Sequence, residues 1–368
     1  AFDALGRQHG ITLGFNGSWQ KPDYISGYYA SWNTPGWPIL FDDTETFDAR
    51  TAWPYDATMR QYVATVFASP LNRGVQNSLG AYGKVDLKLT DSLTLVTGGR
   101  ISWYVVKDYY NGIYQTGSRG KVKGEVTPYL GLVFALSPKW SAYASYADIF
   151  KPQWGYYTRD GDLIAHEIGS NYEVGIKGEL LDGRLTTSLA LYQVNLKNSA
   201  QAEAAPFDQA CPGNPTGGGC YISTGDRRTR GIDVEVNGEI LPGWQVSAGY
   251  TLTDSKILSA DSNIGAPFSL TPRHMAKLFN SYAVNDSLTV GGGMQWQSKE
   301  LSSNGTQPVQ GAYTLWNAFA RYRVTTNLDL NLQVNNIFDK TYWPNGVALY
   351  KSVYGEPRSF MVTLRGRY

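Results

Sequence analysis

Long segments of strictly alternating side chains constrain the fold of this chain more than any other feature. In the last nine residues, 360–368, Phe360, Val362 and Leu364 fall on one face, whereas two arginines fall on the other. A two-residue period is typical of a β-strand, because successive side chains point to opposite faces. The same alternation recurs along the chain, so the pattern describes a whole sheet rather than a single strand.

About fourteen such strands are expected from the period and the turn residues. A short additional strand is possible at 59–68, within the aromatic stretch 21–74. The expected strands are 9–20, 75–90, 93–108, 121–136, 140–150, 167–181, 185–200, 220–240, 244–258, 271–284, 288–301, 311–325, 328–338 and the terminal segment ending at Tyr368.

Strand length and loop length together indicate a membrane barrel. The expected strands are mostly two to three times longer than the roughly five or six residues usual in soluble sheets. Their connections alternate between tight turns and long loops, as in outer-membrane barrels, whose turns are short on one side and long on the other. The alternative, a soluble β-sandwich or solenoid, explains neither feature. We therefore predict an all-β fold, a transmembrane antiparallel β-barrel with the long loops facing outside.

Composition supports this class and disfavours others. The formal net charge is +1, which argues against nucleic acid as a partner, since nucleic-acid binding needs a basic face. The aromatic fraction is 14%, with 26 Tyr and 11 Trp, residues favoured where a ring lies between water and lipid.

The two cysteines, Cys211 and Cys220, flank a segment rich in Pro, Gly and Asn. We expect them to form a disulfide, which implies an oxidising compartment. Two free thiols are the alternative. A metal site is disfavoured, because it would need further ligands nearby.

Several motifs resemble those of TonB-dependent outer-membrane receptors. VNNIFDKTYWP at 334–344, followed by the terminal strand with its GEPR, is similar to the end of that family. TPRH at 271–274, NYEVGIKGELLDGRL at 171–185 and TRGIDVEVNGEI at 229–240 match it in order and spacing. SYADIFKPQ at 145–153 resembles the version found in receptors for ferric hydroxamates and ferripyoverdine.

The resemblance implies a barrel of roughly 22 strands closed by an N-terminal plug. We expect residues 1–368 to be the C-terminal portion of such a barrel, without the plug domain. It also implies an integral bacterial outer-membrane protein, in contact with outer-membrane lipid, that binds an iron–siderophore chelate. Import would use energy from TonB–ExbB–ExbD through the plug, so this portion alone is not expected to be transport-competent.

No intrinsic cofactor or metal site is expected, because Fe(III) is carried within the siderophore. Such a ligand needs flat aromatic surface, hydrogen-bonding groups and a cation for its anionic groups. The candidate ligand-binding residues are Trp154, Tyr156, Tyr157, Arg159, Tyr342, Trp343, Tyr350, Trp32 and Trp37. Any of these aromatics could instead belong to the interface girdle. The arginines Arg227, Arg228, Arg230, Arg358, Arg365 and Arg367 are expected to line the lumen.

Other functions fit the sequence less well. The histidines His9, His166 and His274 are far apart, and no nucleophile motif accompanies them, so we expect no enzyme. A passive porin-like channel is the alternative to a receptor. It is disfavoured because the outer loops are aromatic rather than charged.

Overall fold

The computed structural model describes residues 2–4, 6–20, 23–24, 72–109, 119–203, 219–259, 264–267, 271–301, 308–344 and 354–367. Every regular element within these ranges is a β-strand. No helix in the described part of the chain is long and apolar enough to cross a membrane. The expected strand at 59–68 lies outside the described residues.

Fourteen long strands form the fold, and four short ones accompany them. The long strands are β2 (Arg7–Gln20), β4 (Asn72–Lys88), β5 (Leu93–Tyr109), β6 (Arg119–Ser137), β7 (Trp140–Lys151), β8 (Glu167–Leu180), β9 (Leu185–Ala202), β10 (Tyr221–Leu241), β11 (Trp244–Ser259), β12 (His274–Ala283), β13 (Leu288–Gln297), β16 (Tyr313–Thr325), β17 (Leu328–Asn335) and β18 (Ser359–Gly366). The short strands are β1 (Phe2–Ala4), β3 (Asp23–Tyr24), β14 (Glu300–Leu301) and β15 (Pro308–Gln310).

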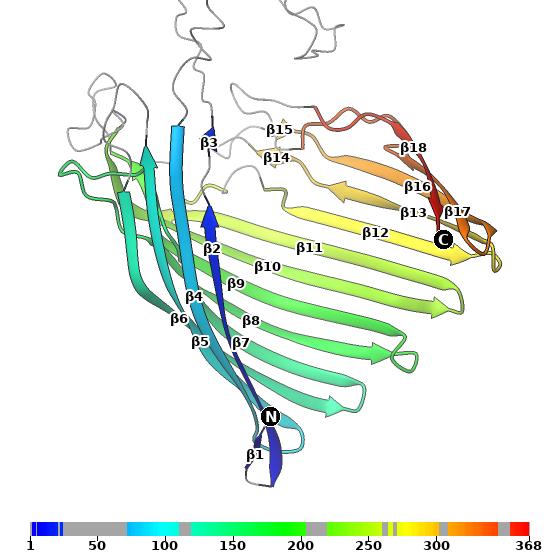
Figure 1. Cartoon of the computed structure of the whole chain (residues 1–368), viewed down its shortest axis with the longest axis horizontal. Coiled ribbons are helices and arrows are strands. Elements are labelled where there is room, and N and C mark those ends of the chain that lie inside the picture. Colours follow the sequence, from blue (N-terminus) through cyan, green and yellow to red (C-terminus); the bar gives the residue numbers. More distant parts are fainter. Residues whose placement is uncertain are drawn as a thin grey trace, which may run out of the picture.

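The long strands form one antiparallel meander in chain order, from β2 to β18. Figure 1 shows a curved sheet with β2 near one edge and β18 at the other. No pairing joins β2 to β18 among the described strands. Tight turns such as 242–243 and 326–327 close one end of the sheet, and the long connections leave from the other, which we call the long-loop end.

One face of the sheet is apolar across its whole width, and we call it the apolar face. A representative row runs from Val174 through Leu191 and Ile232 to Leu252, each residue in register with the next. These side chains are not packed against a second layer: Phe15, at one edge, is 82% exposed, and Val362, at the other, is 70% exposed. An apolar surface of this extent is stable only where lipid or another apolar phase covers it.

The opposite face, the polar face, carries charged and hydrogen-bonding side chains. Glu173 accepts a hydrogen bond of 2.6 Å from the Tyr143 hydroxyl, and the Lys177 ammonium lies 5.0 Å from the centre of the Tyr143 ring. Near β18, Asp329 forms ion pairs with Arg323 and Arg367. The strand register also places Arg227 and Arg365 on the polar face.

Two of the arginines expected to line the lumen lie elsewhere. Arg230 is in register with Gln193, and Arg228 with Asn195, in rows that continue the apolar face. The prediction is wrong for both residues because the strand alternates without interruption from Ile232 to Arg228, which puts Arg228 and Arg230 on the same face as Ile232. Arg358 lies in the connection before β18, where its backbone N–H donates to Asp339.

Three strand ends differ from the expected ones for local reasons. β12 begins at His274, after Pro272, which has no N–H for the ladder. β13 ends at Gln297, and Glu300 begins a separate short hairpin. β17 ends at Asn335 because Asn336 has a left-handed φ of 47°.

Candidate functional site

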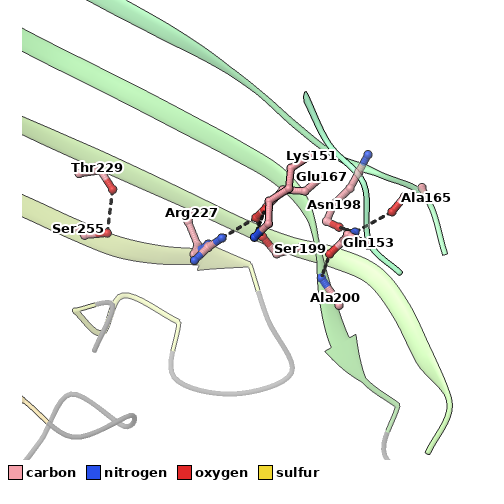
Figure 2. Close-up of polar contacts among 10 residues, drawn as sticks. All are labelled: Lys151, Gln153, Ala165, Glu167, Asn198, Ser199, Ala200, Arg227, Thr229 and Ser255. Atoms are coloured by element: carbon pink, nitrogen blue, oxygen red, sulfur yellow. Dashed lines mark hydrogen bonds and ion pairs between the residues drawn. The ribbon is translucent and has the colours of Figure 1, made fainter. Parts of the chain in front are cut away.

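The β7–β8 loop, residues 152–166, is held at the long-loop end by one buried side chain. Gln153, 8% exposed, donates from Nε2 to the backbone oxygens of Ala165 and Asn198, each at 2.6 Å. Its Oε1 accepts a hydrogen bond of 2.8 Å from Ala200 N–H. Figure 2 shows this amide between the two ends of the loop and β9. All three contacts fix the start of the loop against its own end and against β9.

A buried carboxylate lies beside this anchor on the polar face. The Glu167 side chain is 4% exposed and forms a 2.5 Å ion pair with Arg227 Nη2 and a 3.5 Å ion pair with Lys151 Nζ (Figure 2). The Ser199 hydroxyl donates a further hydrogen bond to it. A buried carboxylate needs such partners, because an unpaired charge in this position would be strongly destabilising.

These groups border a pocket of about 540 Å³. Aromatic rings from the loop meet charged groups from β7, β8 and β10 around it. The lining residues are Lys151, Pro152, Gln153, Trp154, Tyr156, Glu167, Ser199, Ala200, Gln201, Gly225, Arg227, Ile257 and Ser259. The pocket therefore combines flat apolar surface with cations, which suits a bulky ligand that carries negative charge.

Trp154 and Tyr156, both candidate ligand-binding residues, line this pocket. The Trp154 ring lies against Gly120 of β6, where a Cβ would come within 1.9 Å of it. The same ring makes an edge contact with His166, at 6.2 Å between ring centres, and Tyr156 makes one with Tyr221 at 4.7 Å. Both rings are thus supported from behind by other side chains.

Tyr157 and Arg159, from the same predicted group, do not line the pocket. Tyr157 is 4% exposed and bridges to Leu163 through its backbone. Arg159 forms a 2.8 Å ion pair with Glu203. The sequence places all four residues within one short segment, but Tyr157 pairs with Leu163 inside the loop and Arg159 pairs with Glu203.

Tyr342 and Trp343 lie in a second aromatic cluster, in the connection between β17 and β18. Tyr342 packs on Tyr313 at 4.8 Å between ring centres, and Trp343 on Tyr354 at 5.3 Å. Neither residue lines the pocket described above. Trp32, Trp37 and Tyr350 lie outside the described residues.

Cys220 is 5% exposed and is disulfide-bonded. Cys211 lies outside the described residues, so its pairing with Cys220 stays a prediction. Within the described ranges, no group of three or more His, Cys, Asp or Glu side chains is arranged to hold a metal ion.

Trp154 and Tyr156 are the only lining residues that were ligand-binding candidates, and the lining residues that were missed include Lys151, Gln153 and Glu167. Lys151 and Gln153 stand in the motif FKPQ, and Glu167 follows His166 in HEIG, so the segments were visible in the sequence. Their roles were not visible, because Glu167 meets Arg227 only through the register of three strands. Arg227 was placed in the lumen but was not connected to the aromatic loop.

Comparison with known proteins identifies the family. The family model for the β-barrel of TonB-dependent receptor-like proteins matches residues 2–337. The chain belongs to the TonB-dependent receptor family. Barrels of this family are integral outer-membrane proteins, so the apolar face is the surface that contacts lipid.

Two curated relatives are receptors for ferric pyoverdines. The chain is 35% identical to the ferripyoverdine receptor of Pseudomonas aeruginosa, covering 99% of the chain and 43% of that protein. It is 33% identical to the ferric-pyoverdine M114 receptor PbuA of Pseudomonas sp. strain M114, covering 100% of the chain and 44% of that protein. The chain thus spans less than half the length of these relatives.

Solved structures agree with the sequence comparison. The crystal structure of the P. aeruginosa ferripyoverdine receptor bound to ferripyoverdine matches with a TM-score of 0.75 and 33% identity, over 99% of this chain and 46% of that one. The structure of a complex between FpvAI and pyocin S2 matches with a TM-score of 0.77 and 33% identity, over 99% of this chain and 47% of that one.

Proposed function

We propose that this chain is the part of an outer-membrane receptor that binds an iron–siderophore chelate in the pocket beside Trp154. The observation that carries the proposal is the pocket itself, in which Trp154 and Tyr156 stand next to Lys151 and Arg227 at the long-loop end. The relatives are named as receptors for ferric pyoverdines, which supports the same ligand class.

Each group has a role that follows from its chemistry. The Trp154 and Tyr156 rings offer flat surface to the planar or apolar part of the chelate. Lys151 and Arg227 supply positive charge for its anionic groups, and Glu167 holds both cations in place. The chelate's own oxygens hold Fe(III), so the protein supplies no metal ligand and no cofactor.

For the whole protein, we propose that the bound chelate is then imported across the outer membrane. TonB-derived energy would be delivered through a plug domain, and the barrel portion described here would supply the binding surface and the wall of the passage. The relatives are receptors rather than enzymes, which supports a role without catalysis.

Binding of radioactive iron chelates to the whole receptor, measured by equilibrium dialysis, tests the proposal. We expect a ferric pyoverdine to bind and Trp154→Ala to weaken its affinity roughly 10- to 100-fold, as for an aromatic residue central to an interface. The matched control is Trp316→Ala, because Trp316 lies on the apolar face away from the pocket. Absence of binding by ferric pyoverdine, ferric hydroxamate and ferric catecholate alike would contradict the siderophore assignment.

A further inference from the structure

Four cations lie on the apolar face near the long-loop end of β9, β10 and β11. Arg230 is in register with Gln193 and Asp254, and Arg228 with Asn195 and Lys256. Lys197 is in register with Ile168, one row further along. We call Lys197, Arg228, Arg230 and Lys256 the basic patch.

The basic patch begins where the apolar rows end. Arg230 lies two residues beyond Ile232 of the apolar row, a rise of about 6–7 Å along the strand. The row of Arg230 also contains Tyr172, whose ring contacts Tyr146 at 5.2 Å between centres. Tyrosine rings at the end of an apolar band mark the boundary between hydrocarbon and headgroups. The patch therefore lies at headgroup depth, on the surface that faces lipid.

The charges of the patch are largely left without a protein partner in the described part of the chain. Lys256 is 3.7 Å from Asp254, and Arg230 donates from Nε to the neutral Gln193 at 2.7 Å. Arg228 and Lys197 form no ion pair with any described residue. An arginine on this face projects into the headgroup layer, where lipid groups and water are its remaining partners.

A second pocket adjoins the patch at Asp254. Its volume is about 330 Å³, and Arg273, His274 and Lys299 are among the side chains that line it. Its lining thus adds two more cations near the patch, at the edge where β11 extends past the start of β12.

We propose that the basic patch binds the phosphate groups of a lipid headgroup in the leaflet at the long-loop end. A guanidinium donates two parallel hydrogen bonds to a phosphate, and two such groups two residues apart on one strand suit a headgroup that carries more than one phosphate. The acyl chains of the same lipid would lie against the apolar rows that begin at Ile232. The proposal rests on the outer-membrane location and is independent of the siderophore.

Native mass spectrometry of the receptor in a neutral detergent tests this directly. The probes are diphosphoryl lipid A and the same lipid after removal of its phosphates. We expect the diphosphoryl form to bind more tightly than the dephosphorylated form. Arg228→Gln/Arg230→Gln should weaken the binding of the diphosphoryl form roughly 25-fold, because each lost cation costs about 1 kcal/mol and about 1.4 kcal/mol corresponds to a tenfold change in affinity. Arg228→Lys/Arg230→Lys should bind more tightly than Arg228→Gln/Arg230→Gln but less tightly than the unchanged receptor, because the charge stays while the paired hydrogen bonds are lost. This order separates loss of charge from loss of folding.

The matched control is Arg321→Gln/Arg365→Gln, because both of these residues lie on the polar face. This variant should bind the lipid as the unchanged receptor does. Equal binding of the phosphorylated and dephosphorylated lipids, or unchanged binding in Arg228→Gln/Arg230→Gln, would overturn the proposal. Displacement of the lipid by millimolar inorganic phosphate alone would also overturn it, since the patch would then be a site for free anions.

Discussion

The conformation of the proposed ligand site depends on a single uncharged side chain, Gln153. Its side-chain amide donates to the backbone oxygens of Ala165 and Asn198 and accepts from the backbone N–H of Ala200. Because buried backbone groups must be paired, loss of this amide would leave these three groups without their partner. Trp154, the next residue, is thereby fixed at the pocket.

Gln153→Leu should release the β7–β8 loop. The substitution keeps the volume but leaves two backbone oxygens and one N–H without their partner, at a cost of about 1–3 kcal/mol for each buried group. We expect faster proteolytic cleavage within 154–164 and weaker chelate binding, with an unchanged sheet. Gln201→Leu is a suitable control, since Gln201 also lines the pocket but is not part of this anchor. Equal cleavage rates for Gln153→Leu and the unchanged receptor would contradict the role of Gln153.

His166 should make the same loop sensitive to acid. Its ring lies between Phe150 and Trp154, and burial lowers its pKa below the ordinary 6.5. The unfolded loop therefore takes up the proton more readily than the folded loop, so loop stability is full above about pH 6.5 and decreases as the pH falls toward the lowered pKa. The emission of Trp154 is the difference in fluorescence between the unchanged receptor and Trp154→Phe. This difference should change as the pH falls from about 6.5 toward the lowered pKa of His166. His166→Gln should abolish the change, and its persistence in that variant would exclude His166 as the cause.

Close packing between the strands β12, β13 and β16 depends on glycine in β13. Gly291 lies beside the stacked rings of Phe279 and Phe319, which are 5.7 Å apart and nearly parallel. A Cβ at this position would be 2.4 Å from Phe319 Cε1 and 2.6 Å from the Asn280 backbone oxygen. The run GGG at 291–293 thus makes room for neighbours, as expected from its place in a strand.

Gly291→Ala should therefore destabilise the β12–β13–β16 segment by about 1–3 kcal/mol, because the backbone oxygen cannot rotate away as a side chain can. Urea unfolding in detergent micelles measures the change. Gly366→Ala in β18 is the matched control, since a Cβ there meets nothing within 4 Å. Equal unfolding free energies for the two variants would show that the crowding at Gly291 is relieved at no cost.

The two faces of the sheet divide the chain into a lipid-facing surface and an enclosed surface. Large apolar side chains are exposed on the apolar face of nearly every long strand, whereas charged side chains lie on the polar face and, at the long-loop end of the apolar face, in the basic patch. Stability in this arrangement comes from the strand ladder and from lipid, rather than from a buried core, because no described side chain reaches less than 2% exposure.

Leu189→Arg should consequently impair insertion far more than Ser188→Arg. Leu189 is 43% exposed on the apolar face, one row further from the basic patch than Leu191, whereas Ser188 is in register with Lys177 and Glu235 on the polar face. An arginine toward the middle of the lipid-facing band costs about 2–4 kcal/mol. Folding yields into lipid vesicles should fall for Leu189→Arg alone. Equal yields for the two variants would contradict the assignment of the apolar face to lipid.

The strand order, most strand bounds and the two faces follow from the sequence alone, because alternation along a strand is a local property. Thus the expected strands 93–108 and 140–150 correspond closely to β5 and β7. Arg228 and Arg230 were assigned to the wrong face because the expectation followed their charge, whereas the uninterrupted alternation from Ile232 puts them on the apolar face.

The residues that form the pocket come together only when the strands pair. Trp154, Glu167 and Arg227 are separated along the chain, and their meeting depends on the register of β7, β8, β9 and β10. The sequence records which residue types are present, but the hydrogen bonds of Gln153 and the ion pairs of Glu167 arise between segments. Contacts of this kind are set by how strands pair, a long-range property that no local pattern encodes.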